Sequence, residues 1–154
     1  LTACSAAPKK PVARIPFSEV EAEYVALPKT GTGIVTGQAF LRTRGGDVKT
    51  AAGNDVMLNP VTSYSMQWYQ VNYISGTPLE PLDERARKYL IVKTADASGR
   101  FTFKNVPPGD YFVVSHVTWQ SATGYQGSLE TQGGVVAKRI TVRNDEETEV
   151  IVTR

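Results

Sequence analysis

The stretch from Thr94 to Val114, TADASGRFTFKNVPPGDYFVV, contains the turns and the alternation that decide the fold. Asp96 and Gly99 bracket a turn, because aspartate hydrogen-bonds the backbone two residues on and glycine tolerates a positive φ. Phenylalanine then alternates with polar residues over 101–106, and a new apolar run starts at Tyr111. The two prolines between these runs cannot donate to a sheet ladder. The stretch therefore predicts a hairpin followed by a crossover into a third strand.

The rest of the chain has the same short, turn-bounded apolar pattern. Almost no segment keeps the 3.6-residue period of a helix, apart from a turn or two at 19–25 and 83–88. Short strands separated by turn residues are typical of a β-sandwich. We therefore expect an all-β, seven-stranded sandwich with a short helical or irregular insertion, and with strands at 33–41, 55–59, 89–94, 101–106, 111–119, 135–143 and 149–154.

Two motifs of this sequence resemble those of one known family. The pattern D-x-x-G-x-F-x-F-x-x-V-P-x-G-x-Y, formed by residues 96–111, resembles the carboxypeptidase regulatory-like domain, and G-x-V-x-G-x-A at 33–39 is similar to that family's first strand. The resemblance covers 32–154 and implies a prealbumin-like (transthyretin-like) sandwich. It also implies an accessory module without catalytic residues of its own. We expect this domain at 32–154, preceded by an N-terminal tether over 1–31.

The only cysteine of the chain, Cys4, follows a leucine and two small residues. This LTAC sequence resembles the bacterial lipobox, which implies fatty acyl chains such as palmitate on Cys4 and loss of residues 1–3. The Pro-, Ala- and Lys-rich segment 5–16 is typical of an extended tether. Ser5 after the cysteine implies sorting to the outer membrane, so we expect a lipid-anchored outer-membrane protein that faces the periplasm. The alternative is a free thiol in a disordered tail.

Charge, cysteine count and motifs exclude several classes of function. A net charge of +2 gives no electrostatic argument for binding nucleic acid, which favours a basic patch or stripe. One cysteine and one histidine form neither an internal disulfide nor a standard zinc site. The chain has no nucleophile elbow, phosphate loop or dinucleotide fingerprint, and we interpret the mid-strand His116 as packed at the sheet surface. We therefore expect no enzyme, no metal, no cofactor and no nucleic-acid partner.

Two segments carry the candidate binding residues. Between Asn59 and Tyr89 an aromatic-rich insertion replaces the short connection of the family that the chain resembles, and aromatic residues in loops are favoured at interfaces. The alternative is that these rings cover an open edge or end of the sandwich as a lid. The Gly-, Ser- and Gln-rich segment 120–134 is expected to be a long, disordered loop that could order on a partner. The candidate partner- or ligand-binding residues are Tyr64, Trp68, Tyr69, Tyr73 and Tyr125.

Three functions are compatible with these features. The first is a non-catalytic structural or assembly subunit of an envelope complex such as a secretion system, with sheet edges that accept a protein partner's strand. The alternative is a carbohydrate- or small-ligand-binding module in which Trp68, Tyr69 and Tyr73 stack on sugar rings. Exposed, coplanar rings would favour this alternative, whereas buried rings would count against it. A third option is a regulator or inhibitor of a periplasmic enzyme, acting through the segment 120–134.

Overall fold

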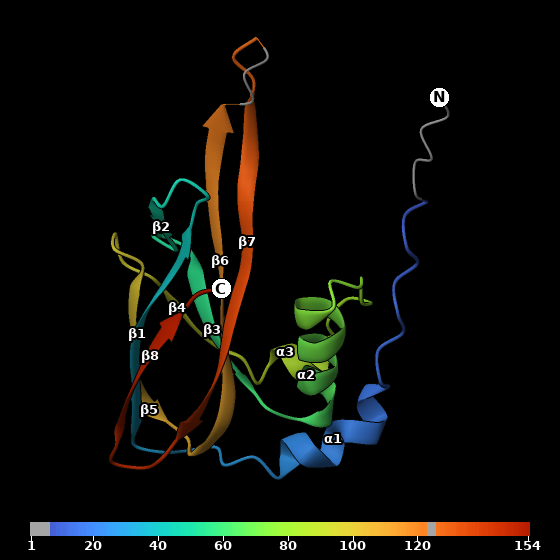
Figure 1. Cartoon of the computed structure of the whole chain (residues 1–154). Helices are drawn as coiled ribbons and strands as arrows, with labels where there is room; N and C mark the ends of the chain where they lie inside the picture. The colour runs from blue at the N-terminus through green and yellow to red at the C-terminus, as the bar shows by residue number, and fades with distance from the viewer. Residues whose placement is uncertain (1–6, 123–125) are drawn as a thin grey trace.

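The computed structural model describes residues 7–122 and 126–154. Two four-stranded sheets pack face to face, and a group of short helices lies beside one of them (Figure 1). The described part of the chain has eight strands. The all-β sandwich expected from the alternation is therefore confirmed.

The first sheet is built around β1 (Gly33–Arg42). This strand pairs with β5 (Arg100–Val106) antiparallel and with β8 (Glu147–Val152) parallel. The short strand β2 (Val48–Thr50) pairs with the end of β1. The expectation of seven strands omitted β2, because three residues without apolar alternation give no pattern to detect.

The second sheet has the order β4-β3-β6-β7, with every pair antiparallel. Its strands are β4 (Ile91–Thr94), β3 (Asp55–Pro60), β6 (Gly109–Ala122) and β7 (Leu129–Val142). The last two strands pair over their whole length and form an arm that extends beyond the rest of the sandwich (Figure 1).

This arm corrects the prediction of a disordered loop over 120–134. The strands continue to the pair Ala122 and Leu129, although the segment shows no apolar alternation. A backbone ladder needs no apolar side chains where both faces of a hairpin meet solvent, so the pattern gave no signal there.

The apolar core lies between the two sheets. On β6 the side chains of Tyr111, Val113 and Val117 are buried in this core, together with residues of the first sheet such as Val35 and Phe103. The alternate side chains of β6 point to the other face of the sheet. Phe112 and Val114 are nevertheless also buried, because the helical insertion covers this outer face.

Four helical segments form a second, smaller cluster. They are α1 (Phe17–Val25), α2 (Ser63–Gln67), the π-helix η1 (Trp68–Ile74) and α3 (Glu84–Arg87). The spacing of Phe17, Val20 and Tyr24 gives α1 one apolar face, which packs on Tyr64 and Ala86.

The N-terminal segment joins this cluster before α1 begins. Val12 forms a parallel bridge with Leu79, and its N–H donates to the carbonyl of Pro78 at 2.9 Å. The tether expected over 1–31 is therefore shorter, because the chain from Val12 onward already contacts the insertion. The boundary expected at residue 32 missed this contact, because the packing partners lie some 50 to 70 residues away in the sequence.

Candidate functional site

A capping box fixes the start of the aromatic insertion. The side chain of Thr62 accepts a hydrogen bond from the N–H of Ser65 at 3.2 Å, and Ser65 Oγ accepts one from the N–H of Thr62 at 2.8 Å. Such reciprocal bonds satisfy backbone donors that a helix start leaves open. Ser65 Oγ also donates to the carbonyl of Pro60 at 2.7 Å. The insertion is thereby fixed to the end of β3.

The π-helix then places its aromatic side chains against the outer face of the second sheet. Tyr69 stacks on Phe112, with ring centroids 4.6 Å apart and planes 13° apart. The hydroxyl of Tyr73 accepts a hydrogen bond from the N–H of Ala137 on β7 at 3.0 Å. For Tyr69 and Tyr73, the structure therefore shows the arrangement expected of a lid.

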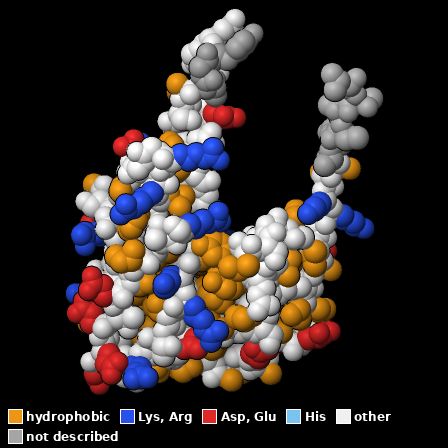
Figure 2. All heavy atoms as spheres, viewed as in Figure 1, with side chains coloured by type: hydrophobic (Ala, Val, Ile, Leu, Met, Phe, Trp, Pro, Cys, Tyr) orange, Lys and Arg blue, Asp and Glu red, His pale blue; other side chains and the backbone are white. Residues whose placement is uncertain are grey.

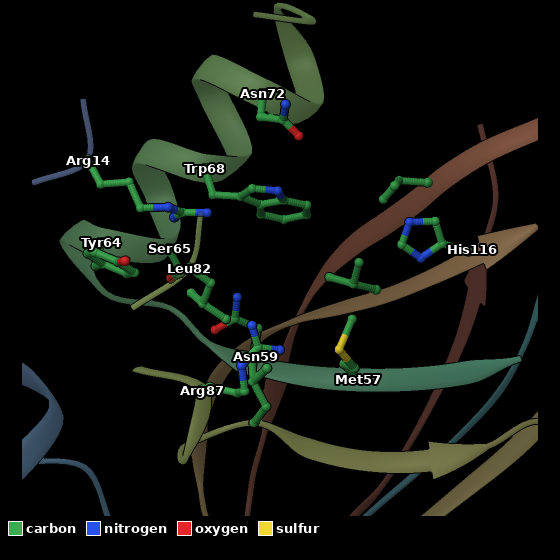
Figure 3. Close-up of a pocket in the computed structure, with 13 residues that line it drawn as sticks. Arg14, Met57, Asn59, Tyr64, Ser65, Trp68, Asn72, Leu82, Arg87 and His116 are labelled. Atoms are coloured by element: carbon green, nitrogen blue, oxygen red, sulfur yellow. The ribbon is translucent and has the colours of Figure 1, made fainter. Parts of the chain in front are cut away.

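Trp68 also packs edge-on against Phe112, with ring centroids 6.2 Å apart, but unlike the two tyrosines it lines a cleft. Its indole stacks on Tyr73 with a centroid distance of 5.9 Å and an interplanar angle of 24°, and it extends from the helix over a cleft (Figure 3). Tyr64 also lines this cleft but is only 1% exposed. Its hydroxyl accepts a hydrogen bond from the N–H of Asp83 at 2.9 Å. Cys4 and Tyr125 lie outside the described residues.

The cleft has a volume of about 320 Å³ and lies between the sandwich and the helical cluster. Figure 2 shows hydrophobic side chains gathered in the hollow between these two parts. The outer face of the second sheet forms the floor, and the π-helix, the segment around α3 and the N-terminal segment form the walls. The lining residues are Arg14, Met57, Asn59, Tyr64, Ser65, Trp68, Asn72, Leu82, Arg87, Leu90, Val114, His116 and Val135.

Polar groups lie around an apolar floor in this cleft. Met57, Val114 and Val135 supply the floor, while Asn59 and His116 bring an amide and an imidazole to it (Figure 3). Neither of these two polar side chains makes a hydrogen bond with another residue in the described ranges. Their donors and acceptors are therefore available to a ligand.

Charged pairs surround α3 at the edge of the site. The carboxylate of Asp83 accepts a hydrogen bond from the N–H of Arg85 at 2.8 Å, which caps α3, and it pairs with the Arg85 guanidinium at 2.9 Å. These hydrogen bonds from the Arg85 side chain and backbone lower the pKa of Asp83 to about 2. On the sheet itself, Arg139 and Thr141 lower the pKa of Asp110 by hydrogen bonding.

Comparisons with family models and with curated proteins find no match. Among solved structures, a crystal structure of a "putative carbohydrate binding protein" from Pseudomonas aeruginosa matches with a TM-score of 0.76 and 30% sequence identity. The alignment covers 87% of this chain and 96% of that chain. The chain belongs to the same family as this Pseudomonas aeruginosa protein. Since nearly all of the Pseudomonas protein is covered, the relationship extends over the whole fold and not over one sheet alone.

The amino-acid sequence indicated only some of the residues that line the cleft. Trp68 and Tyr64 were expected from their aromatic character, and both line the cleft. His116 was placed at the sheet surface by the alternation along β6, but not at a cleft. Arg14 and Arg87 gave no signal, because tertiary packing alone brings their segments to the sheet.

Metal sites and membrane-spanning helices are both absent from the part of the chain that the structure describes. In 7–122 and 126–154, no group of three or more His, Cys, Asp and Glu side chains is placed to hold a metal ion. Within the same ranges, no helix combines the length and the apolar character needed to cross a membrane.

Proposed function

We propose that this protein is a non-catalytic saccharide-binding protein and that the cleft beside Trp68 is its binding site. The observation that carries the proposal is an indole extending over an apolar floor that has unengaged amide and imidazole groups beside it. The family relationship with the Pseudomonas protein supports the same function.

The chemistry of a sugar matches this arrangement. One face of a pyranose ring carries C–H groups that pack on an aromatic ring, and its edge carries hydroxyls that both donate and accept hydrogen bonds. Trp68 offers the ring. Asn59 and His116 offer donors and acceptors at the ring edge.

The size of the cleft favours a short ligand segment. Its volume of about 320 Å³ is at the lower end of the roughly 300–1,000 Å³ that small-molecule sites occupy. Tyr69 and Tyr73 are engaged with Phe112 and Ala137, so the expected platform of three free rings does not form. We therefore expect one or two sugar units to be bound, and not a long chain lying along the surface.

The comparisons favour this function over the assembly subunit expected first. The relative is named for carbohydrate binding, and neither the fold nor the comparisons point to an envelope complex. Lipid attachment at Cys4 stays a prediction, and it would place the cleft near a membrane. Cys4→Ser protein should then leave the membrane fraction, whereas its retention there would contradict the anchor.

Calorimetric titration against a panel of short oligosaccharides tests the function. Wild-type protein should bind at least one member, and Trp68→Ala should weaken this binding by about tenfold. The other tryptophan, Trp119 on the arm, does not line the cleft, so Trp119→Ala is the matched control and should bind like wild type. Failure of the wild type to bind any saccharide, or equal loss in both variants, would contradict the proposal.

A further inference from the structure

The charged side chains that line the cleft have one sign. They are Arg14 and Arg87, and no aspartate or glutamate is among the lining residues that the structure describes. A neutral sugar needs no cation, because its hydroxyls bind amides and imidazoles equally well. A guanidinium instead matches a carboxylate, which it binds through two parallel hydrogen bonds.

Arg14 has one side-chain nitrogen without a hydrogen-bond partner. Its Nε donates to the backbone carbonyl of Glu80, and its guanidinium lies over the Tyr64 ring at 5.0 Å. Its Nη1 is shielded from solvent and has no hydrogen-bond partner. A buried charged donor without a partner is costly and uncommon in native proteins, so an acceptor atom that reached this nitrogen would satisfy it.

The neighbouring carboxylates do not neutralise this arginine. Glu80 Oε2 accepts a hydrogen bond from the backbone N–H of Arg14 at 3.1 Å, and Asp83 pairs with Arg85. Glu84 lies 3.2 Å from the Nε of Arg87. Among the described residues, Arg14 takes part in no ion pair. Its guanidinium is therefore not held by a carboxylate of the described residues.

Gln67 fixes Arg14 next to the indole. Its side-chain amide donates to the carbonyl of Ala13 at 3.0 Å and accepts from the N–H of Ile15 at 2.9 Å. These two bonds hold the backbone on both sides of Arg14. Because Gln67 directly precedes Trp68 in the sequence, they keep Arg14 close to the indole. Figure 3 shows the guanidinium reaching toward the indole.

We infer from these contacts that the ligand is an acidic saccharide, with its sugar ring on Trp68 and its carboxylate bound by Arg14. This inference rests on the proposed saccharide function and adds the class of sugar. Arg87 lies at the same cleft and adds positive charge, partly balanced by Glu84.

Two matched ligands test the inference: a short uronic-acid oligosaccharide, and the same oligosaccharide with its carboxyl groups reduced to alcohols. Calorimetry should show wild-type protein binding the acidic form about tenfold or more tightly. This preference should fall with added salt, because salt screens a partly exposed charge. Arg14→Gln should lose the preference and keep the affinity for the reduced form. Arg14→Lys should retain part of it, because a lysine keeps the charge but not the paired donors.

The matched control is Arg44→Gln, an exposed arginine in the turn between β1 and β2, which should bind like wild type. Equal wild-type affinity for both oligosaccharides would overturn the acidic class and leave saccharide binding intact. Binding of neither would overturn the proposed function itself. A preference that survives in Arg14→Gln, or a sulfated oligosaccharide of equal length that binds as tightly, would overturn the assignment of a carboxylate to Arg14.

One further measurement needs no variant and so does not depend on Arg14→Gln folding. The Arg14 side-chain N–H resonances of the wild-type protein should shift when the acidic oligosaccharide is added, and not when the reduced form is added. Shifts of equal size with both ligands would overturn the inference.

Discussion

The hydroxyl of Tyr73 bridges two backbone groups of Ala137: it accepts from the N–H at 3.0 Å and donates to the carbonyl at 3.4 Å. Ala137 lies on β7, which pairs within the described residues only with β6. The side chain thus takes the place of a neighbouring strand at this position. Unpaired strand edges can accept another chain, so the insertion protects part of the edge that an assembly partner would use.

Removing this hydroxyl alone should loosen the insertion. Tyr73→Phe keeps the ring but leaves the two Ala137 groups to water, so we expect the free energy of unfolding to fall by about 1 kcal/mol. Urea denaturation measures the change. Tyr69→Phe is the control on the same helix, because Tyr69 is held by its stack on Phe112. A loss of equal size in both variants would contradict the bridging role of Tyr73.

The capping box should contribute to stability independently of the rings. Thr62→Ala removes the acceptor for the Ser65 N–H and the partner of the Tyr24 hydroxyl, which lies 3.1 Å away. Loss of an N-cap costs about 1 kcal/mol, and the buried Tyr24 hydroxyl adds to this cost. The exposed Ser63 is bound through its backbone N–H to Glu23, so thermal unfolding of Ser63→Ala should be unchanged. A Thr62→Ala midpoint equal to wild type would exclude the role of the cap.

The β6–β7 arm should depend on one glycine and not on its neighbour. Gly133 has φ +106°, and a Cβ there would lie 1.9 Å from the carbonyl oxygen of Val117. Gly133→Ala should therefore destabilise the arm by about 2 kcal/mol. A Cβ on Gly134 would meet no atom within 4 Å. Hydrogen exchange along β6 and β7 should accelerate in Gly133→Ala and stay near wild type in Gly134→Ala, and the reverse order would refute the prediction.

Alkaline pH should destabilise the fold through Tyr111. Burial raises the pKa of Tyr111 to about 12, from an ordinary value of 10.0, so the folded state holds this proton more tightly than the unfolded chain. The contribution to stability is complete below pH 10 and is lost as the pH rises from about 10 to 12. Denaturation curves from pH 9 to 12 measure this loss.

Tyr111→Phe provides the comparison for the alkaline loss. It removes the titrating group and the hydrogen bond from the hydroxyl to the carbonyl of Pro107 at 2.8 Å. The variant should be less stable at neutral pH by about 1 kcal/mol, and its stability should fall less steeply above pH 10. An identical alkaline slope in both proteins would show that Tyr111 does not control it.

The sandwich was predictable because its information is local. The pattern from Asp96 to Tyr111 contains a turn, an alternating strand and a crossover in sixteen residues, and the structure has β5 and β6 in these positions. The hairpin expected across the turn was wrong, because β4 pairs with β3 and β5 pairs with β1, so the turn joins the two sheets. The arm beyond Trp119 was not predictable, since its ladder forms from polar residues that show no period. The short strand β2 was missed for the same reason.

The site was predictable only where it depended on residue type. An aromatic-rich insertion suggested Trp68, but the same criterion also selected Tyr64, which is a core residue held by Asp83. Arg14 reaches the cleft because Gln67 binds the backbone beside it. This pair is separated by 53 positions in the sequence, and no local pattern connects them.

The π-helix makes the length of the insertion matter as well as the identity of its residues. Trp68 and Tyr73 are five positions apart, which an α-helix would turn about 140° away from each other, yet here they stack. The wider turn is visible in the bond from the N–H of Ser75 to the carbonyl of Gln70. Deleting one residue between them would restore an ordinary helix and rotate every later side chain by about 100°. Insertions and deletions in this segment should therefore be selected against more strongly than substitutions at exposed positions such as Ile74.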